Sequence, residues 1–363
     1  MTRERAFWRI FGDIPGRMGG CLGGWLFGLS GARPESLNFT FFSPDRSVWR
    51  FIVAMALADL PHMKIILLGP DGQVGWELRR ALALLGDVIA LTRGDGSTGL
   101  CGDLGRPDAL AATVMALRPD IVVNAGAYTA VDKAESDADT ARTVNALAPG
   151  ALARATAEVG GWLLHYSTDY VFDGSGNQPR NEEAATGPLS VYGRTKLEGE
   201  DLIRASGCRH LILRTSWVHA ARGGNFARTM LRLAAERERL TVIDDQVGAP
   251  TGADLLADIA AHALRQAVVD DTLSGTYHAA ATGAVTWCGY ARHVLAWAQQ
   301  RGVALKAGPD AVQAIHTRNY PTPAARPLNS RLDTTRLQRC FGLHLPSWQS
   351  GVDRMLTEAL NLR

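Results

Sequence analysis

Four side chains near the middle of the chain have the types and spacing for acid–base chemistry. Tyr192 and Lys196 lie four residues apart in a segment followed by good helix formers, so both are expected on one face of a helix. A lysine ammonium beside a phenol favours the phenolate, which should lower the pKa of Tyr192 and make it a usable proton donor. Thr168 and Asp169 stand upstream, and the Thr168 hydroxyl is suited to hold a substrate oxygen against that phenol.

A buried strand must position Thr168 and Asp169. Residues 161–166 are mostly apolar, and the hydroxyl and acidic residues follow directly. In open parallel α/β sheets ligands bind at the carboxyl ends of the strands, where these residues are expected. His165, inside the apolar run, is interpreted as a packed core histidine rather than a ligand. The alternative for Tyr192 and Lys196 is a surface pair at a chance helical spacing.

A glycine-rich turn follows the strand expected at residues 64–68 and precedes an amphipathic helix. Gly69 permits a tight turn, Gly72 lets the backbone approach a pyrophosphate, and Gly75 lets the helix pack on the strand. The helix N-terminus adds its dipole and N–H groups. A tight turn without a ligand is the alternative. The expected pyrophosphate contacts are Gly69, Gly72, Gln73, Val74 and Gly75.

The next two strands are expected to meet the rest of a dinucleotide. Arg93 follows the second strand and is placed to pair with a 2′-phosphate, which favours NADPH over NADH, although a solvated loop arginine fits the sequence nearly as well. Asp103 and its neighbour Leu104 are expected at the adenine. Small residues after the strand at 120–124 let the cofactor approach the backbone, and the contacts expected there are Ala125, Ala127 and Thr129. The strand–helix alternation from Met63 onward predicts an α/β fold with a doubly wound, Rossmann-like parallel sheet.

Composition limits the class of protein. The 363 residues are 46% hydrophobic and 20% charged with net charge +2, which is typical of a soluble globular protein and gives no signal for nucleic acid. No apolar run reaches the roughly 20 residues of a membrane span. Five scattered cysteines without a Cys-x-x-Cys pair indicate reduced thiols in a cytoplasmic protein and no metal framework.

The first 62 residues differ from the rest. They contain Arg but no Lys, a glycine-rich patch and no sustained periodicity, whereas Met63 opens a regular strand. We interpret residues 1–62 as a mis-assigned extension or a disordered tail, with a targeting or partner-binding arm as the alternative. Residues 63–363 are expected to form the NAD(P)-binding, Rossmann-like part, with a smaller C-terminal substrate lobe contributed mainly by about residues 215–363.

Separated motifs carry a resemblance to a known family. The glycine turn, the Ser-Thr-Asp segment at 167–169 and the Tyr-x-x-x-Lys pair together resemble an extended short-chain dehydrogenase/reductase. Further segments, at 124–135, 214–218, 245–251, 320–327 and 329–333, resemble the dTDP-4-dehydrorhamnose reductase family. The likeness covers residues 63–363. It implies reduction of a 4-keto sugar nucleotide, dTDP-4-dehydro-β-L-rhamnose, to dTDP-L-rhamnose with NADPH or NADH.

The resemblance also implies roles for single residues. Tyr192 would be the proton donor, with Lys196 as its partner and with Thr168 and Asp169 at the substrate. Trp217 would stack on or shape the sugar pocket. Arg326 stands in a proline-rich loop that is suited to line the substrate cleft, and its guanidinium is expected to be free for bidentate bonds to a diphosphate.

Metal binding and assembly follow from the resemblance alone. Some members of the family bind Mg²⁺ between subunits, and Glu77, Asp254 and Glu358 occupy the matching positions, which would make the protein a homodimer. A solvated acidic face is the alternative for these residues.

Three other functions stay open at this stage. Two are enzymes, a sugar-nucleotide dehydratase or an epimerase. The third is a non-catalytic binding module like the regulatory subunit of methionine adenosyltransferase. Tyr170 stands where a dehydratase of this superfamily carries a glutamate base.

Overall fold

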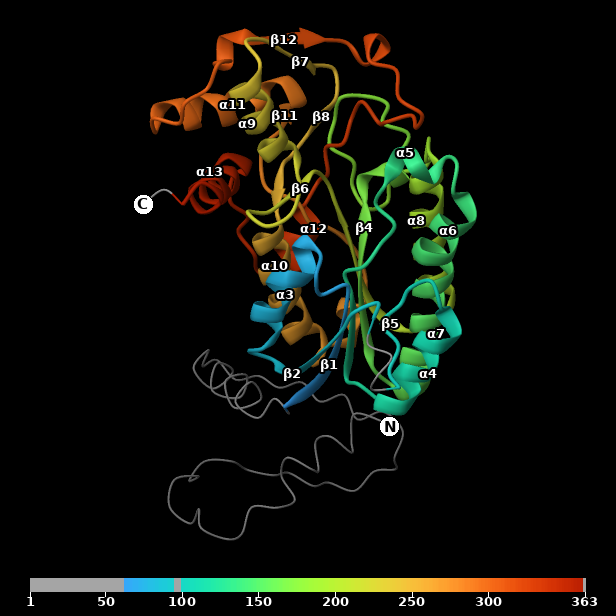
Figure 1. Cartoon of the computed structure of the whole chain (residues 1–363). Helices are drawn as coiled ribbons and strands as arrows, with labels where there is room; N and C mark the ends of the chain where they lie inside the picture. Colours follow the sequence, from blue (N-terminus) through green and yellow to red (C-terminus); the bar gives the residue numbers. More distant parts are fainter. Residues whose placement is uncertain (1–61, 95–98, 362–363) are drawn as a thin grey trace, which may run out of the picture. The chain divides into compact units, whose positions relative to one another are not determined.

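The computed structural model describes residues 62–94 and 99–361, which lie in one compact unit, Pro61–Arg363. The interpretation of residues 1–62 falls, apart from His62, outside the described residues. A parallel six-stranded sheet in the order β10-β5-β4-β3-β1-β2 forms the centre of this unit (Figure 1). Its strands are β1 (Met63–Leu68), β2 (Gly86–Leu91), β3 (Ile121–Asn124), β4 (Trp162–Thr168), β5 (Arg209–Thr215) and β10 (Gly275–His278).

Alternate residues of each strand pack on opposite faces, as the two-residue period of a strand requires. On β1, Ile65 and Leu67 face one helical layer, whereas Ile66 and Leu68 face the other. The first layer contains α3 (Gln73–Leu82), α10 (Ala253–Ala267) and α12 (Thr335–Phe341), and the second contains α4 (Pro107–Leu117), α7 (Ala148–Val159) and α8 (Val191–Ala205). Figure 1 shows α3 and α10 on one side of the sheet and α4, α7 and α8 on the other. The predicted doubly wound sheet is confirmed.

The segment between β3 and α7 is divided into short helical elements. Two short helices, α5 (Val131–Ala134) and α6 (Ala138–Arg142), are followed by a π-helical turn, Thr143–Leu147, that runs directly into α7. Such turns are rare and concentrate at functional sites. The π turn contains Asn145, which is buried and whose side chain contacts α8.

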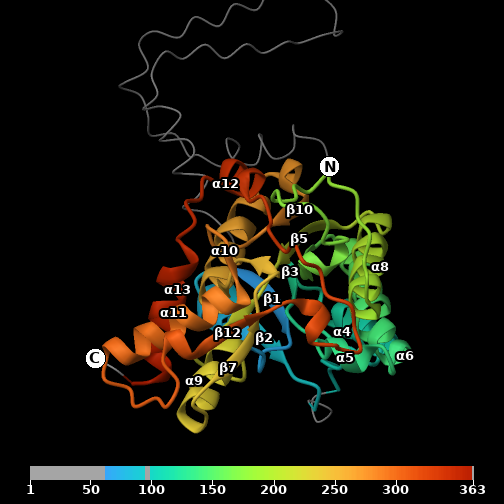
Figure 2. The same ribbon diagram turned by 90° about the horizontal axis from the view of Figure 1, so that it is seen from above.

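A smaller lobe is built from short strand pairs and three helices. The pairs are β6 (Val218–His219) with β9 (Thr251–Gly252), β7 (Leu240–Ile243) with β12 (Val312–Ile315), and β8 (Val247–Gly248) with β11 (Val285–Thr286). The helices are α9 (Phe226–Glu236), α11 (Trp287–Gln300) and α13 (Trp348–Ala359), and Figure 2 shows α9, α11, β7 and β12 side by side. Short 3₁₀ turns lie at Asp169–Val171, Asp271–Leu273, Pro309–Ala311 and Thr317–Asn319.

The range expected to form the substrate lobe divides between two parts of the molecule. Within about 215–363, β10, α10 and α12 return to the central sheet and contribute to its core, whereas α9, α11 and α13 enclose separate apolar clusters. The chain therefore crosses repeatedly between the sheet and the lobe. In residues 62–94 and 99–361, no helix is long and apolar enough to cross a membrane.

Candidate active site

Helix α8 carries both Tyr192 and Lys196, as the four-residue spacing predicts. The helix begins at Val191 because the Ser190 hydroxyl accepts a hydrogen bond from the Gly193 N–H at 3.2 Å, an N-cap that satisfies one of the helix's unpaired donors. Tyr192 lies in the first turn, and its ring meets the ring of Tyr170 edge to face, with centroids 5.5 Å apart. Lys196 lies one turn further on and is 1% exposed.

The pKa of Tyr192 is raised to about 12, not lowered. Burial is the largest cause; a hydrogen bond with Thr168 acts in the opposite direction, and the charge of Asp169 raises the pKa further. The expectation that Lys196 lowers this pKa is therefore wrong for this structure. The reason is that the Lys196 amine is directed to partners on β4. The expected meeting of Thr168 with the phenol is present.

The Lys196 amine is held by two groups of β4. Its Nζ lies 3.0 Å from His165 Nε2 and donates a hydrogen bond to the Tyr166 carbonyl at 2.6 Å. Burial lowers the pKa of Lys196 to about 8, against the attraction of Glu200 one turn along the helix. Near neutral pH this lysine is thus much closer to losing its proton than a solvated lysine.

His165 is completely buried, as expected for a core histidine, but it is not isolated. Its Nδ1 lies 3.1 Å from Asn124 Nδ2, and Asn124 Oδ1 accepts from the Gly126 N–H at 3.1 Å. Sequence reasoning did not place Asn124 or His165 in the site. The signal was present, because both are polar residues in central strands that are otherwise apolar, and buried polar groups need partners.

Asp169 is 2% exposed at the end of β4. Burial raises its pKa to about 6, although hydrogen bonds with Ser330 and Thr168 lower it. Its Oδ2 has no hydrogen-bond partner among the described residues. A carboxyl of this kind is half protonated near pH 6 and keeps one oxygen for a ligand. Ser330 comes from a segment more than 150 residues away in the sequence, so local spacing does not reveal it.

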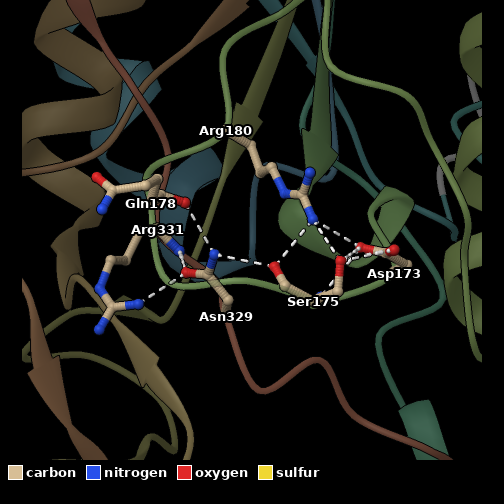
Figure 3. A network of polar contacts seen from close by, with 6 residues as sticks. All are labelled: Asp173, Ser175, Gln178, Arg180, Asn329 and Arg331. Atoms are coloured by element: carbon tan, nitrogen blue, oxygen red, sulfur yellow. Dashed lines mark hydrogen bonds and ion pairs between the residues drawn. The ribbon is translucent and has the colours of Figure 1, made fainter.

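The segment that brings Ser330 to the site is tied to the loop that follows β4 (Figure 3). The Asn329 Nδ2 donates to the carbonyls of Gln178 and Ser175 at 2.8 and 3.3 Å. On the other side, the Arg180 guanidinium donates to the Asp173 carboxylate at 2.9 Å and to Ser175. Backbone bonds from the Arg180 N–H to the Arg331 carbonyl, and from Asp333 back to Arg180, complete the connection. These contacts hold residues 329–333 across the end of β4.

The glycine turn has the shape that a dinucleotide requires. Gly69 has φ +72°, and a Cβ on it would lie 2.7 Å from the Gly126 nitrogen. A Cβ on Gly75 would lie 1.9 Å from the Gly69 carbonyl oxygen, so the helix packs on the turn only with glycine there. A Cβ on Gly72 would meet only the Gly69 carbonyl oxygen, at 3.4 Å, so its outer side is open.

Helix α3 also has the N-terminus that this use needs. It begins at Gln73 and Val74 with no side-chain cap, which leaves N–H groups available for an anion. The residues present therefore fit a dinucleotide pyrophosphate. The other expected cofactor contacts lie beyond the neighbouring strands β2 and β3.

On the adenosine side, Arg93 and Asp103 come together. Arg93 Nε lies 3.7 Å from Asp103 Oδ1, with the arginine side chain 86% exposed. Leu104 packs against Gly126, where an added Cβ would lie 2.5 Å from the leucine Cδ1. Ala125, Ala127 and Thr129 belong to the irregular segment between β3 and α5.

Arg326 is engaged, contrary to the expectation of a free guanidinium. Its Nη1 and Nη2 donate to the two carboxylate oxygens of Asp132 at 3.0 and 2.7 Å, and this pairing lowers the pKa of Asp132. The bidentate geometry that was expected for a diphosphate is taken up by this carboxylate. The sequence motif 124–135 contains Asp132, but spacing alone does not show that it meets a loop 194 residues later.

Trp217 stacks on another tryptophan. Its ring lies 3.6 Å from that of Trp287, with 13° between the planes, and its backbone has φ +49°. The left-handed conformation is uncommon for a bulky residue and marks a position held by its surroundings. Gly248 provides the room, because a Cβ there would lie 2.7 Å from the Trp217 ring. Trp217 thus connects β6 with α11 in the smaller lobe.

The acidic residues considered for Mg²⁺ do not gather within the chain. Glu77 lies 3.7 Å from Arg80, and Asp254 forms an ion pair with Arg354 at 2.8 Å. Over residues 62–94 and 99–361, no group of three or more His, Cys, Asp or Glu side chains is arranged to hold a metal ion. Glu358, on α13, therefore does not join the other two in one site. Mg²⁺ binding is not supported.

The parallel sheet, the glycine turn, and the Thr168, Tyr192 and Lys196 side chains at one strand end define an NAD(P)-dependent oxidoreductase of the short-chain dehydrogenase/reductase type. A family model described as "RmlD substrate binding domain" matches residues 63–361. The chain is 54% identical over 296 residues to the dTDP-4-dehydrorhamnose reductase of Escherichia coli K12, covering 82% of this chain and 98% of that protein. It belongs to the dTDP-4-dehydrorhamnose reductase family.

Two further relatives agree. The dTDP-4-dehydrorhamnose reductase of Burkholderia thailandensis is 47% identical over 304 residues, covering 82% of this chain and all of that protein. The crystal structure of the Bacillus anthracis enzyme in complex with NADP has a TM-score of 0.73 and 31% identity, covering 82% and 99% of the two chains. The family assignment thus rests on sequence and on fold.

Proposed function

We propose that this chain reduces the 4-keto group of dTDP-4-dehydro-β-L-rhamnose to give dTDP-L-rhamnose, with NADPH or NADH as the reductant. The observation that carries the proposal is the arrangement of Tyr192, Thr168 and Lys196 beside a glycine turn that fits a dinucleotide. Membership of the family supplies the substrate. The nicotinamide cofactor, when bound, supplies the hydride that adds to the keto carbon.

The side chains of this site then deal with the keto oxygen. As negative charge develops there, Tyr192 gives it the phenol proton, and the Thr168 hydroxyl donates a hydrogen bond to the same oxygen. The raised pKa of Tyr192 serves this direction of reaction, because the phenol stays protonated at neutral pH until the oxygen needs the proton. Asp169, with one unpaired buried oxygen, would hold a sugar hydroxyl.

Lys196 would act on the cofactor ribose and on the phenol from the same face of α8. Its amine has a lowered pKa, so it exchanges protons near neutral pH and can restore the proton that Tyr192 gives away. Gly69, Gly72, Gln73, Val74 and Gly75 would hold the pyrophosphate. Arg93 would pair with the 2′-phosphate of NADPH, which favours that cofactor.

The alternative functions, a dehydratase, an epimerase and a binding module, have less support. Tyr170 follows Asp169, so the glutamate base of a dehydratase is missing. An epimerase would keep its cofactor through purification. A non-catalytic binding module needs none of the arrangement around Tyr192. A cytoplasmic location and a homodimeric state stay predictions.

The direct test is an assay of the purified chain. Mixed with the 4-keto sugar nucleotide and NADPH, it should consume one reduced nicotinamide for each keto group, measured by the loss of absorbance. Retained nicotinamide absorbance after purification, with no consumption of added NADPH, would favour the epimerase instead. Binding of the sugar nucleotide without turnover would favour a binding module.

A further inference from the structure

The loop between β6 and α9 reaches the first turn of α3 from the smaller lobe. Arg222 lies in this loop, and its Cζ is 3.9 Å from the centroid of the Trp76 ring on α3. The next residue, Gly223, lies against Gln73, and a Cβ on it would be 3.5 Å from the glutamine Cγ. Gln73 is the first residue of α3, so the loop stands beside the glycine turn and the unpaired N–H groups of this helix end.

The backbone that carries Arg222 is held by the smaller lobe. The Asn225 Nδ2 donates to the Ala220 carbonyl at 2.6 Å, and the Asn225 Oδ1 accepts from the Arg228 N–H at 3.1 Å, which caps α9. Gly223 has φ +78°, a left-handed conformation that glycine adopts without strain. The chain can therefore turn sharply after Arg222 and still pass close to α3.

The Arg222 guanidinium is a cation without a carboxylate to neutralise it. Within the described part of the chain its charge meets the Trp76 ring and no ion-pair partner. Arg79 also lies near this ring, at 5.7 Å, but it is paired with Asp71 of the glycine turn at 3.4 Å. A cation–π contact uses the positive charge and leaves the N–H donors of a guanidinium available. Arg222 thus has both the charge and the donors that bind an anion.

We propose that Arg222 binds the diphosphate of the dinucleotide cofactor, an inference that rests on the proposed function. The glycine turn and the N-terminus of α3 would bind this diphosphate through backbone N–H groups. Arg222 would add a planar fork of donors from the smaller lobe, which suits phosphate oxygens. It would also bring a full positive charge to a group that Asp71, in the turn itself, repels.

This role differs from the one proposed for Arg93. The diphosphate is common to NADH and NADPH, whereas the 2′-phosphate is present only in NADPH. Arg222 should therefore increase the affinity for both cofactors, and Arg93 should increase the affinity for NADPH alone. Because the loop belongs to the smaller lobe, the contact would also join this lobe to the bound cofactor.

A sugar nucleotide carries a diphosphate as well, so the two ligands must be separated. The contact of Gly223 with Gln73 favours the dinucleotide, because Gln73 belongs to the turn after β1 where the cofactor pyrophosphate is expected. The measurement must therefore compare the cofactors with a nucleotide diphosphate that resembles only the substrate.

The test is binding measured by titration calorimetry, without turnover. Dissociation constants are obtained separately for NADPH, NADH and dTDP, with the natural chain and with Arg222→Gln. We expect both dinucleotides to bind roughly tenfold more weakly to the variant, because it loses hydrogen bonds to a charged group, and dTDP to bind equally well. The loss should shrink at high salt, as a charge interaction requires. Arg222→Lys, which keeps the charge without the fork, should lie between.

Two controls accompany this variant. Arg232→Gln removes one arginine from α9, where the side chain is 61% exposed and lies 3.4 Å from Glu236, and it should leave all three dissociation constants unchanged. Arg93→Ala should weaken NADPH binding alone. The Tm of Arg222→Gln should stay within about 2 °C of that of the natural chain, since substitutions of exposed side chains change stability little.

The outcomes separate this inference from the proposed function. Unchanged binding of both dinucleotides by Arg222→Gln would overturn the inference and leave the proposed reduction intact. Weaker binding of dTDP with unchanged binding of the dinucleotides would assign Arg222 to the substrate and also overturn it. A natural chain that binds neither dinucleotide would refute the proposed function and the inference together.

Discussion

Replacing Glu200 by leucine should destabilise the fold more than any comparable change on α8. Glu200 and Arg214 are both buried, and the arginine Nε and Nη2 donate to the two carboxylate oxygens at 2.9 and 2.7 Å. Burial alone would raise the pKa of Glu200, but Arg214 holds it below the ordinary value. The pair joins α8 to β5, so Glu200→Leu leaves an uncompensated guanidinium between them. Removing one partner of a buried pair costs roughly 3–5 kcal/mol.

Urea unfolding should show this loss directly, and Tm should fall by about 10 °C. The matched control is Glu198→Leu on the same helix. Glu198 Oε1 lies 2.7 Å from Nη2 of Arg142, whose side chain is half exposed. Exposed ion pairs contribute about 1 kcal/mol or less to stability, so this change should cost little. The double variant Glu200→Leu/Arg214→Leu should be more stable than either single variant, since no buried charge is left alone. Equal losses in Glu200→Leu and Glu198→Leu would refute this reasoning.

Four further predictions concern the site and the chain start. Tyr192→Phe should lower kcat by about 10²- to 10⁴-fold with little change in KM. Adding Lys196→Met should lower kcat no further, because the two side chains act as a unit. Additive losses would show that the two side chains act independently. Arg93→Ala should raise KM for NADPH several-fold and leave KM for NADH nearly unchanged, whereas equal effects would make Arg93 irrelevant to the choice. The pKa of Asp169 is raised from 3.8 to about 6, so between these pH values the folded chain keeps a proton that the unfolded chain has lost. The free energy of unfolding should therefore fall by about 3 kcal/mol as the pH rises from below 3.8 to above 6. Asp169→Asn should remove that slope in urea titrations. A chain that starts at Met63 should fold and turn over substrate at the rate of the full chain, and an insoluble or inactive product would contradict this.

The sheet was predictable because its strands are regular and close in sequence to the turns that mark them. The apolar residues 63–68 and 161–166 each predict a strand, and the glycine spacing between the first strand and the following helix predicts the first turn. The pair on α8 was predictable for the same reason, since the four-residue spacing of Tyr192 and Lys196 needs only local geometry. Local sequence patterns thus predict the helices and strands, and they predict which residues lie on the same face of one helix or strand.

Contacts between distant segments were not predictable from spacing. Arg326 was expected to be free, but it meets Asp132 because the proline-rich loop folds back onto the segment after β3. Ser330 reaches Asp169 because residues 329–333 are tied to the loop after β4. The predicted lowering of the Tyr192 pKa was also wrong. Burial raises this pKa, and the neighbouring Lys196 amine is directed to other partners. Such features depend on tertiary packing between distant segments, and the local sequence pattern of one chain does not predict that packing.

The measurement that tests the central claim most directly uses NADPH with deuterium at the transferred position of the nicotinamide. The purified chain and dTDP-4-dehydro-β-L-rhamnose should give dTDP-L-rhamnose with one deuterium at C4 of the sugar, seen by NMR and mass spectrometry. Tyr192→Phe should give the same product at a rate lower by about 10²- to 10⁴-fold. An unchanged sugar nucleotide, or a product without deuterium at C4, would contradict the proposed reduction.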